Sequence, residues 1–89
     1  MKESLQILII DDDETDRMNV QNLLEKEGLK GKVHEASDYS SGMEKIRAHK
    51  FDCVLIDYKL PDATGVEILE RLRDVDRYNA PLILLTGMG

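Results

Sequence analysis

Residues 51–73, FDCVLIDYKLPDATGVEILERLR, decide the fold of this chain. The apolar run CVLI predicts a buried strand that ends at Asp57. A loop follows, which Pro61 fixes and Gly65 loosens, and the apolar residues that come next, as far as Leu72, mark a helix. The stretch therefore predicts a strand, a loop and a helix, with a carboxylate at the carboxyl end of the strand.

Two other apolar runs have the same character. ILII at residues 7–10 leads into Asp11, and LILL at residues 82–85 leads into Thr86. The expected elements are strands at residues 5–10, 32–36, 51–56 and 82–86, and helices at residues 13–27, from residue 38 onward, and at residues 66–72. This βαβαβαβ order predicts an α/β fold in which helices cover both faces of a parallel sheet.

The first expected helix, at residues 13–27, has recognisable ends. Asp13 or Thr15 can cap its start, and Gly28 can end it in a left-handed conformation. Its apolar face is expected to consist of Met18, Val20, Leu23 and Leu24.

Composition excludes several classes of protein. A length of 89 residues allows one domain, and a net charge of −6 argues against binding to nucleic acid or to an anionic membrane. Cys53 is the single cysteine, so no intrachain disulfide can form. No segment approaches the about 20 apolar residues of a membrane span, and MKESLQ at the start is not a signal region. We expect a cytoplasmic protein.

The strand ends carry the candidate chemistry. Ligands of open parallel sheets bind at the carboxyl ends of the strands, so Asp11, Asp12 and Asp57 are expected to lie together. Two carboxylates about 4 Å apart repel by roughly 4 kcal/mol at an effective dielectric near 20. Mg²⁺ would relieve this repulsion, and a carboxylate beside it can accept a phosphoryl group. Thr86 adds a hydroxyl that can hydrogen-bond a phosphoryl oxygen.

With these pieces in place, the chain resembles the receiver domains of two-component response regulators. ILIIDDDE, FDCVLIDYKLPDATGVEILERLR and APLILLTG occur in the order of that family, and the resemblance extends from Leu5 to Gly87. It implies a flavodoxin-like three-layer sandwich with strand order 2-1-3-4. It also implies a signalling domain rather than an enzyme, with Mg²⁺ as cofactor and a histidine kinase or phosphotransfer protein as partner.

The resemblance assigns roles to individual residues. The implied roles are phosphoacceptor for Asp57, direct metal ligand for Asp12, neighbouring ligand often acting through water for Asp11, metal ligand through its backbone carbonyl for Lys59, switch hydroxyl for Thr86, and loop shaping for Pro61 and Gly65.

The chain departs from the family pattern at its end. Receivers carry a lysine at the end of a fifth strand, and this chain has no equivalent of it. We therefore expect residues 1–89 to be a single receiver domain truncated after its fourth strand, in which slow self-phosphorylation and dephosphorylation are properties of the intact domain only. Apolar surface on the last strand and first helix should then be exposed, and the open sheet edge should favour self-association.

Two other interpretations stay open. In a haloacid-dehalogenase-type phosphatase, Asp11 would be the nucleophile, Asp13 the general acid/base and Thr15 the end of a D-x-D-x-T motif, but Asp57 would have no role. In the second, the chain is a truncated, self-associating binding module without phosphoryl chemistry.

Overall fold

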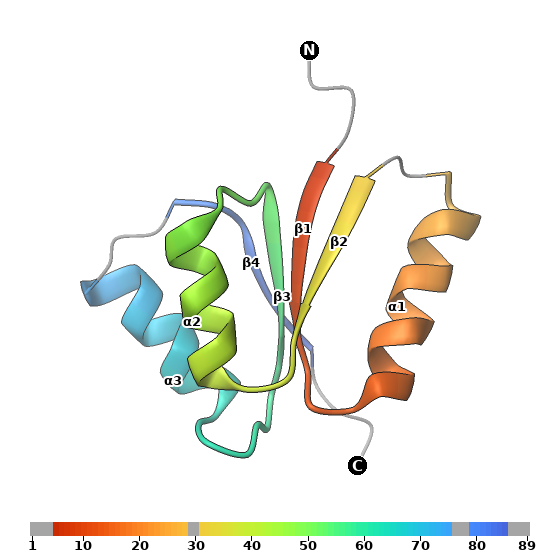
Figure 1. The fold of residues 1–89 in the computed structure, drawn as a ribbon. Coiled ribbons are helices and arrows are strands. Elements are labelled where there is room, and N and C mark those ends of the chain that lie inside the picture. Colours follow the sequence, from red (N-terminus) through yellow and green to blue (C-terminus); the bar gives the residue numbers. More distant parts are fainter. Residues whose placement is uncertain (1–4, 29–30, 76–78, 86–89) are drawn as a thin grey trace.

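The structure is a computed structural model that describes residues 5–28, 31–75 and 79–85. Strands and helices alternate in the order expected from the sequence (Figure 1). Their bounds are β1 (Leu5–Ile10), α1 (Glu14–Lys26), β2 (Gly31–Ala36), α2 (Tyr39–Ala48), β3 (Cys53–Asp57), α3 (Gly65–Glu70), a π-helical turn η1 (Arg71–Val75) and β4 (Leu82–Leu85). The third helix is thus shorter than expected, because its last turn widens into η1.

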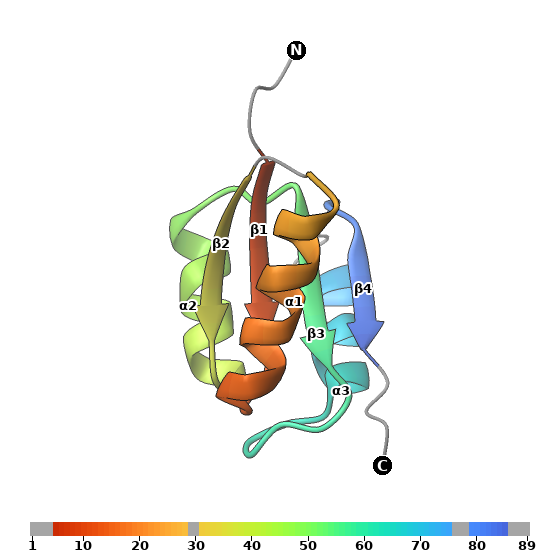
Figure 2. The ribbon, with the colours of Figure 1, turned by 90° about the vertical axis from the view of Figure 1, so that its right-hand side faces the viewer.

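The sheet confirms the predicted topology. Its four strands are parallel and lie in the order β2-β1-β3-β4. Helix α1 covers one face, and α2 and α3 cover the other (Figure 1). All four strands point to the same end of the sheet, where the β1–α1 connection and the β3–α3 loop also lie (Figure 2). This shared end is the place for a site.

Among the described residues, the two central strands supply most of the hydrophobic side chains that have no exposed surface. Leu8 and Ile10 of β1, and Val54 and Ile56 of β3, have no exposed surface. They form one cluster with residues from the helices on that face, namely Met43, Ile68 and Leu72. Burying each such side chain contributes about 1.5–3 kcal/mol relative to leaving it in water. The burial of these strands therefore fixes the middle of the sheet.

Helix α1 differs from the expectation for its apolar face. Met18 is 54% exposed and Leu23 is 56% exposed, so the assignment of these two residues to the inner face is wrong. The half-buried positions are instead Arg17, Val20, Gln21 and Leu24. These follow the i, i+3, i+4, i+7 spacing of one helix face. Two of these four residues are polar, so a face predicted from the apolar residues alone differs from the face that is half-buried.

The helix ends confirm the expected caps. The Asp13 carboxylate accepts a hydrogen bond from the Thr15 amide at 2.8 Å, so Asp13 is the N-cap of α1. Gly28, just past α1, has a φ of +74°, the left-handed conformation that glycine adopts without strain. Helix α3 begins with a capping box in which Thr64 and Glu67 each accept a hydrogen bond from the other's backbone amide.

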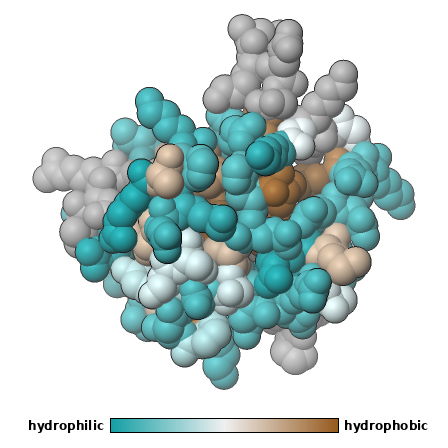
Figure 3. All heavy atoms as spheres, viewed as in Figure 1, coloured by the Kyte–Doolittle hydropathy of each residue, from teal (hydrophilic) through white to brown (hydrophobic). Residues whose placement is uncertain are grey.

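The surface also matches one expectation from the sequence. The face drawn in Figure 3 is largely hydrophilic, with small apolar areas. Ile83 on β4 is 47% exposed and, like Met18 and Leu23 on α1, presents apolar surface to solvent. This confirms the predicted exposure of apolar surface on the last strand; on α1 the exposed apolar residues are Met18 and Leu23, which lie outside the half-buried stripe. Among the described residues, no helix has the length and apolar character needed to cross a membrane.

Gly65 is required where α3 meets the end of β3. Its amide donates to the Tyr58 carbonyl at 2.8 Å, which brings the start of α3 close to the strand end. A Cβ at this position would collide with the Asp57 carbonyl oxygen and with the Leu84 side chain. Glycine is therefore required at position 65 on steric grounds, because backbone and strand occupy the space that a side chain needs.

Gly65→Ala should therefore lower the free energy of unfolding by about 2–3 kcal/mol, because the overpacked backbone has to move. Urea denaturation measures the change. Val66→Ala, one residue later on the exposed side of the same helix, is the control and should stay within about 0.5 kcal/mol of the wild type. A Gly65→Ala protein as stable as the wild type would contradict this account.

Candidate functional site

Three carboxylates meet at the carboxyl end of the sheet. Strands β1 and β3 are neighbours, and Ile10 pairs with Ile56, so the next residues, Asp11 and Asp57, lie side by side. Asp12 joins them from the β1–α1 connection. One carboxylate oxygen from each of the three residues lies within 4.8 Å of the other two. The proximity expected from the sequence is therefore present in the fold.

The three residues differ in exposure. Asp11 is buried, with 3% of its surface exposed, whereas Asp57 is half-buried and Asp12 is exposed. One oxygen of Asp11 accepts a hydrogen bond from the Asp13 amide at 2.9 Å, and its backbone amide donates to the Ala36 carbonyl at 2.9 Å. Asp11 is thus fixed in place, and Asp12 faces solvent, where a hydrated ion could reach it.

The electrostatics of the site favour a cation. Burial raises the pKa of the Asp11 carboxyl, and the negative charges of Asp57, Asp16 and Asp12 raise it further. Burial also raises the pKa of Asp57, with additional contributions from Asp12 and Asp16. Hydrogen bonds from the backbone amides of Tyr58 and Lys59 to Asp57 act in the opposite direction but are outweighed. A divalent cation between the carboxylates would favour their charged forms and so lower the pKa values of Asp11 and Asp57.

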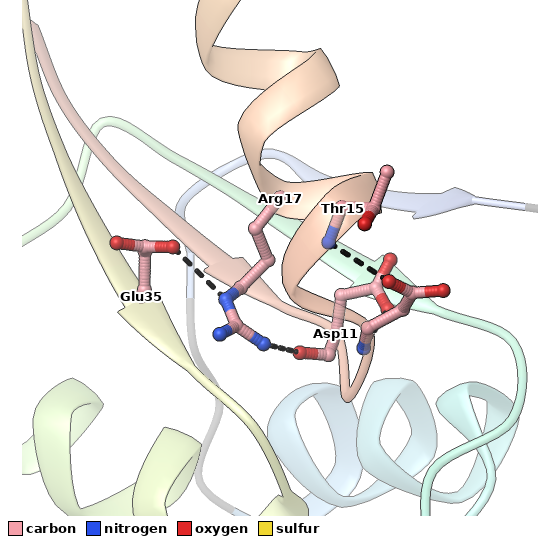
Figure 4. Close-up of polar contacts among 5 residues, drawn as sticks. Asp11, Thr15, Arg17 and Glu35 are labelled. Carbon is pink, nitrogen blue, oxygen red and sulfur yellow. Dashed lines mark hydrogen bonds and ion pairs between the residues drawn. The ribbon is translucent and has the colours of Figure 1, made fainter.

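The Arg17 side chain links the β1–α1 connection to strand β2. Its Nη1 donates to the backbone carbonyl of Asp11 at 2.6 Å, and its Nε donates to Oε1 of Glu35 at 2.9 Å (Figure 4). Glu35 lies on β2, so the guanidinium ties the acidic connection to the neighbouring strand. The Arg17 guanidinium contacts the backbone carbonyl of Asp11, so the carboxylates of the cluster stay available to other ligands.

The loop between β3 and α3 is closed by its own hydrogen bonds. Lys59 and Thr64 form an antiparallel bridge, and the Leu60 amide donates to the Ala63 carbonyl at 3.0 Å. Leu60 is buried in the core cluster, while Pro61 at the tip is exposed. This loop follows Asp57 directly, so it holds Lys59 two residues from the carboxylate cluster.

Two sequence expectations concern residues elsewhere. Thr86 lies outside the described residues; the preceding Leu85 pairs with Asp57 across β4 and β3. Asp13, the general acid/base of the phosphatase interpretation, serves as the N-cap of α1. Among the described residues, the grouped carboxylates are those of Asp11, Asp12 and Asp57, which favours an assignment that uses Asp57.

Sequence reasoning missed three residues around the site: Arg17, Glu35 and Asp62. Asp62, in the β3–α3 loop, accepts hydrogen bonds from the amides of Tyr39 and Ser40 at the start of α2. The only available signal was a basic residue in an otherwise acidic segment at Arg17. No pattern in the sequence connects Asp62 with a helix 23 residues away.

Comparison with known proteins identifies a family that matches this chain. A family model described as the response regulator receiver domain matches residues 7–89. The transcriptional regulatory protein SrrA of Staphylococcus aureus (strain NCTC 8325 / PS 47) is 33% identical over 86 residues, which are 97% of this chain and 34% of SrrA. The chain thus spans about a third of the length of this curated relative.

Solved structures agree with the fold. The MaeR response regulator bound to beryllium trifluoride superposes with a TM-score of 0.86 at 26% identity, over 96% of this chain and 69% of that chain. The receiver domain of the sensor histidine kinase PA1611 from Pseudomonas aeruginosa PAO1, with a magnesium ion coordinated in its active site cleft, gives 0.80 at 21% identity, over 96% and 69%. At that identity the second likeness shows the fold alone. The family match leaves out only the first six residues, and the chain therefore belongs to the response regulator receiver domains of two-component signal transduction.

Proposed function

We propose that this chain accepts a phosphoryl group on Asp57 from a histidine kinase or phosphotransfer protein, with Mg²⁺ held by Asp11, Asp12, Asp57 and the backbone carbonyl of Lys59. The observation that supports this most directly is the cluster of three carboxylates with oxygens within 4.8 Å of one another. Three oxygen ligands without a basic side chain among them suit a hard divalent cation. The magnesium ion in the PA1611 receiver adds support from the same fold.

The chemistry asked of the chain is limited. A carboxylate oxygen of Asp57 attacks the phosphorus of the partner's phosphohistidine, the P–N bond breaks, and its electron pair stays with the donor imidazole. The product is an acyl phosphate on Asp57. Bound Mg²⁺ supplies neutralisation of the charge on the phosphoryl oxygens. The chain itself contributes the acceptor and its orientation, as a signalling domain rather than an enzyme.

Other parts of the proposal rest on the sequence and family. Thr86 is proposed as the hydroxyl that responds to phosphorylation, and Pro61 as a shaping residue of the loop. We place the domain in the cytoplasm, where the single free cysteine, half-buried Cys53, stays reduced. Although SrrA is named a transcriptional regulatory protein, we propose no direct nucleic-acid contact for this acidic chain.

The central test is intact-protein mass spectrometry after incubation with Mg²⁺ and a histidine phosphotransfer protein phosphorylated on its histidine, with peptide mapping of the adduct. The wild type should gain one phosphoryl group on Asp57, and Asp57→Asn should abolish it because an amide is not a phosphoryl acceptor here.

Asp13→Asn is the matched control, since asparagine caps a helix as well as aspartate does. This variant should be phosphorylated normally if Asp57 is the acceptor. It should lose activity if Asp13 is the general acid of a phosphatase. An adduct on Asp11, or none on a wild type that binds Mg²⁺, would contradict the proposal.

Mg²⁺ affinity should fall on acidification, beginning above pH 3.8, the ordinary carboxyl pKa, because the pKa values of Asp11 and Asp57 are raised. A protonated carboxyl does not ligate the ion, so each proton that must leave costs up to about tenfold in affinity per pH unit below its pKa. Isothermal titration calorimetry between pH 4.5 and 8 measures this. Asp57→Asn should bind more weakly and with a shallower pH dependence, whereas a flat wild-type profile would contradict the account.

Self-association is a second part of the proposal, supported by the sheet edge. Among the described residues, β4 pairs with β3 alone, and Figure 2 shows it clear of α1 at the edge of the sheet. Exposed Ile83 lies beside half-buried Leu55 on the α1 side. An apolar strand with a free edge can pair with a second copy.

Sedimentation at tens of micromolar should therefore show a reversible dimer for the wild type. Ile83→Lys should shift it to monomer, because a charge on the edge strand opposes pairing. Val66→Lys, which alters an exposed apolar residue of α3 and leaves the edge strand unchanged, should leave the dimer intact. A wild type that is monomeric throughout would refute self-association.

A further inference from the structure

Asp62 connects the loop after Asp57 with helix α2. Its Oδ1 accepts a hydrogen bond from the Tyr39 amide at 2.7 Å, and its Oδ2 accepts one from the Ser40 amide at 3.2 Å. Tyr39 and Ser40 are the first two residues of α2. The Asp62 carboxylate therefore joins the β3–α3 loop to two residues that lie 22 and 23 positions earlier in the chain.

The first backbone amides of α2 need hydrogen-bond acceptors from outside the helix. The first amides of a helix lack partners within the helix, and a negative charge there is favourable. Asp38, the N-cap, accepts from the Ser41 amide at 2.8 Å and so serves only the third of them. Asp62 serves the first two. Two carboxylates, one from the helix cap and one from the loop, thus complete the same helix end.

The loop that carries Asp62 is stiff enough to transmit this attachment. Its stem is closed by the Lys59–Thr64 bridge and by the Gly65–Tyr58 hydrogen bond, and Leu60 is buried in the core. The Leu60–Ala63 hydrogen bond closes the tip around Asp62. The hydrogen bonds from α2 to Asp62 then fix the position of this closed loop, Lys59 included, relative to the helix.

We propose that Asp62 is a positioning residue for the phosphoryl-accepting site, acting through the loop that presents the Lys59 carbonyl and adjoins Asp57. This inference rests on the proposed function, because it presupposes a metal held by that carbonyl. Loss of the attachment lets the loop tip move and places the carbonyl less well for the ion. By thermodynamic linkage, an ion that orders the loop must in turn strengthen the hydrogen bonds from Tyr39 and Ser40 to Asp62.

The first test compares two variants that each remove one cap of α2. Asp62→Ala should weaken Mg²⁺ binding by roughly tenfold, the lower end of the range for residues that support metal ligands indirectly. Asp38→Ala is the matched control, because it removes a cap of the same helix without touching the loop. It should change the affinity by less than about twofold. Equal affinities for the wild type and Asp62→Ala, or equal losses in both variants, would overturn the inference.

A second test uses the unmodified 89-residue chain and so does not depend on a variant that folds. Hydrogen exchange followed by NMR should show slower exchange of the Tyr39 and Ser40 amides when Mg²⁺ is added, with a smaller effect at Ser41, which is bonded to Asp38. A helix cap with no connection to the site would show no dependence on Mg²⁺, and that result would overturn the inference.

The two tests separate this inference from the proposed function. A wild type that binds no Mg²⁺ would contradict the proposed site and, with it, the role of Asp62. A wild type that binds Mg²⁺ and is phosphorylated on Asp57, while Tyr39, Ser40 and the Asp62→Ala protein show no response, would leave the proposed function intact and refute the positioning role alone.

Discussion

The parallel pairing of β1 with β3 is the constraint on which the rest of the structure depends. It aligns Ile10 with Ile56 and so leaves Asp11 and Asp57 next to each other at the strand ends. Two carboxylates about 4 Å apart repel by roughly 1–4 kcal/mol, depending on how much water screens them. Each fully buried side chain in the two strands contributes about 1.5–3 kcal/mol in the opposite direction. Apolar burial therefore outweighs the repulsion and holds charges together that would otherwise separate.

The sequence predicted this part of the fold well because burial and chemistry follow the same pattern there. Apolar runs identify the inner strands, and the carboxyl ends of parallel strands must meet, so the grouping of Asp11, Asp12 and Asp57 follows without any knowledge of side-chain positions. The strand order came from the family resemblance. Helix α1 was harder, because only half of its inner stripe is apolar. Met18 and Leu23 are exposed, and the half-buried positions of α1 are Arg17 and Gln21 as well as Val20 and Leu24.

The polar braces of the site could not be predicted in the same way. Arg17 reaches Glu35 across 18 residues, and Asp62 reaches Tyr39 across 23. Each pair joins segments whose relative position is set by the packing of the sheet and helices, and charged residues on exposed segments have many potential partners. Hydrophobic periodicity carries no information about which of these partners is chosen. Such contacts become visible only once the apolar framework has placed the segments.

The hydrogen bonds of Arg17 and Asp62 each hold one of the two loops of the site. The β1–α1 connection, with Asp11 and Asp12, is tied by Arg17 to β2, and the β3–α3 loop, with Lys59, is tied by Asp62 to α2. Strand pairing sets how close the carboxylates come, but it does not set the angle at which each loop leaves its strand. That angle depends on the polar attachments, which lie in exposed or partly exposed places where a hydrogen bond contributes about 0.5–1.5 kcal/mol. The framework is therefore rigid, while the placement of each loop depends on a few weak attachments. On the proposed function, a change of charge at Asp57 would then alter the surrounding surface without disturbing the core.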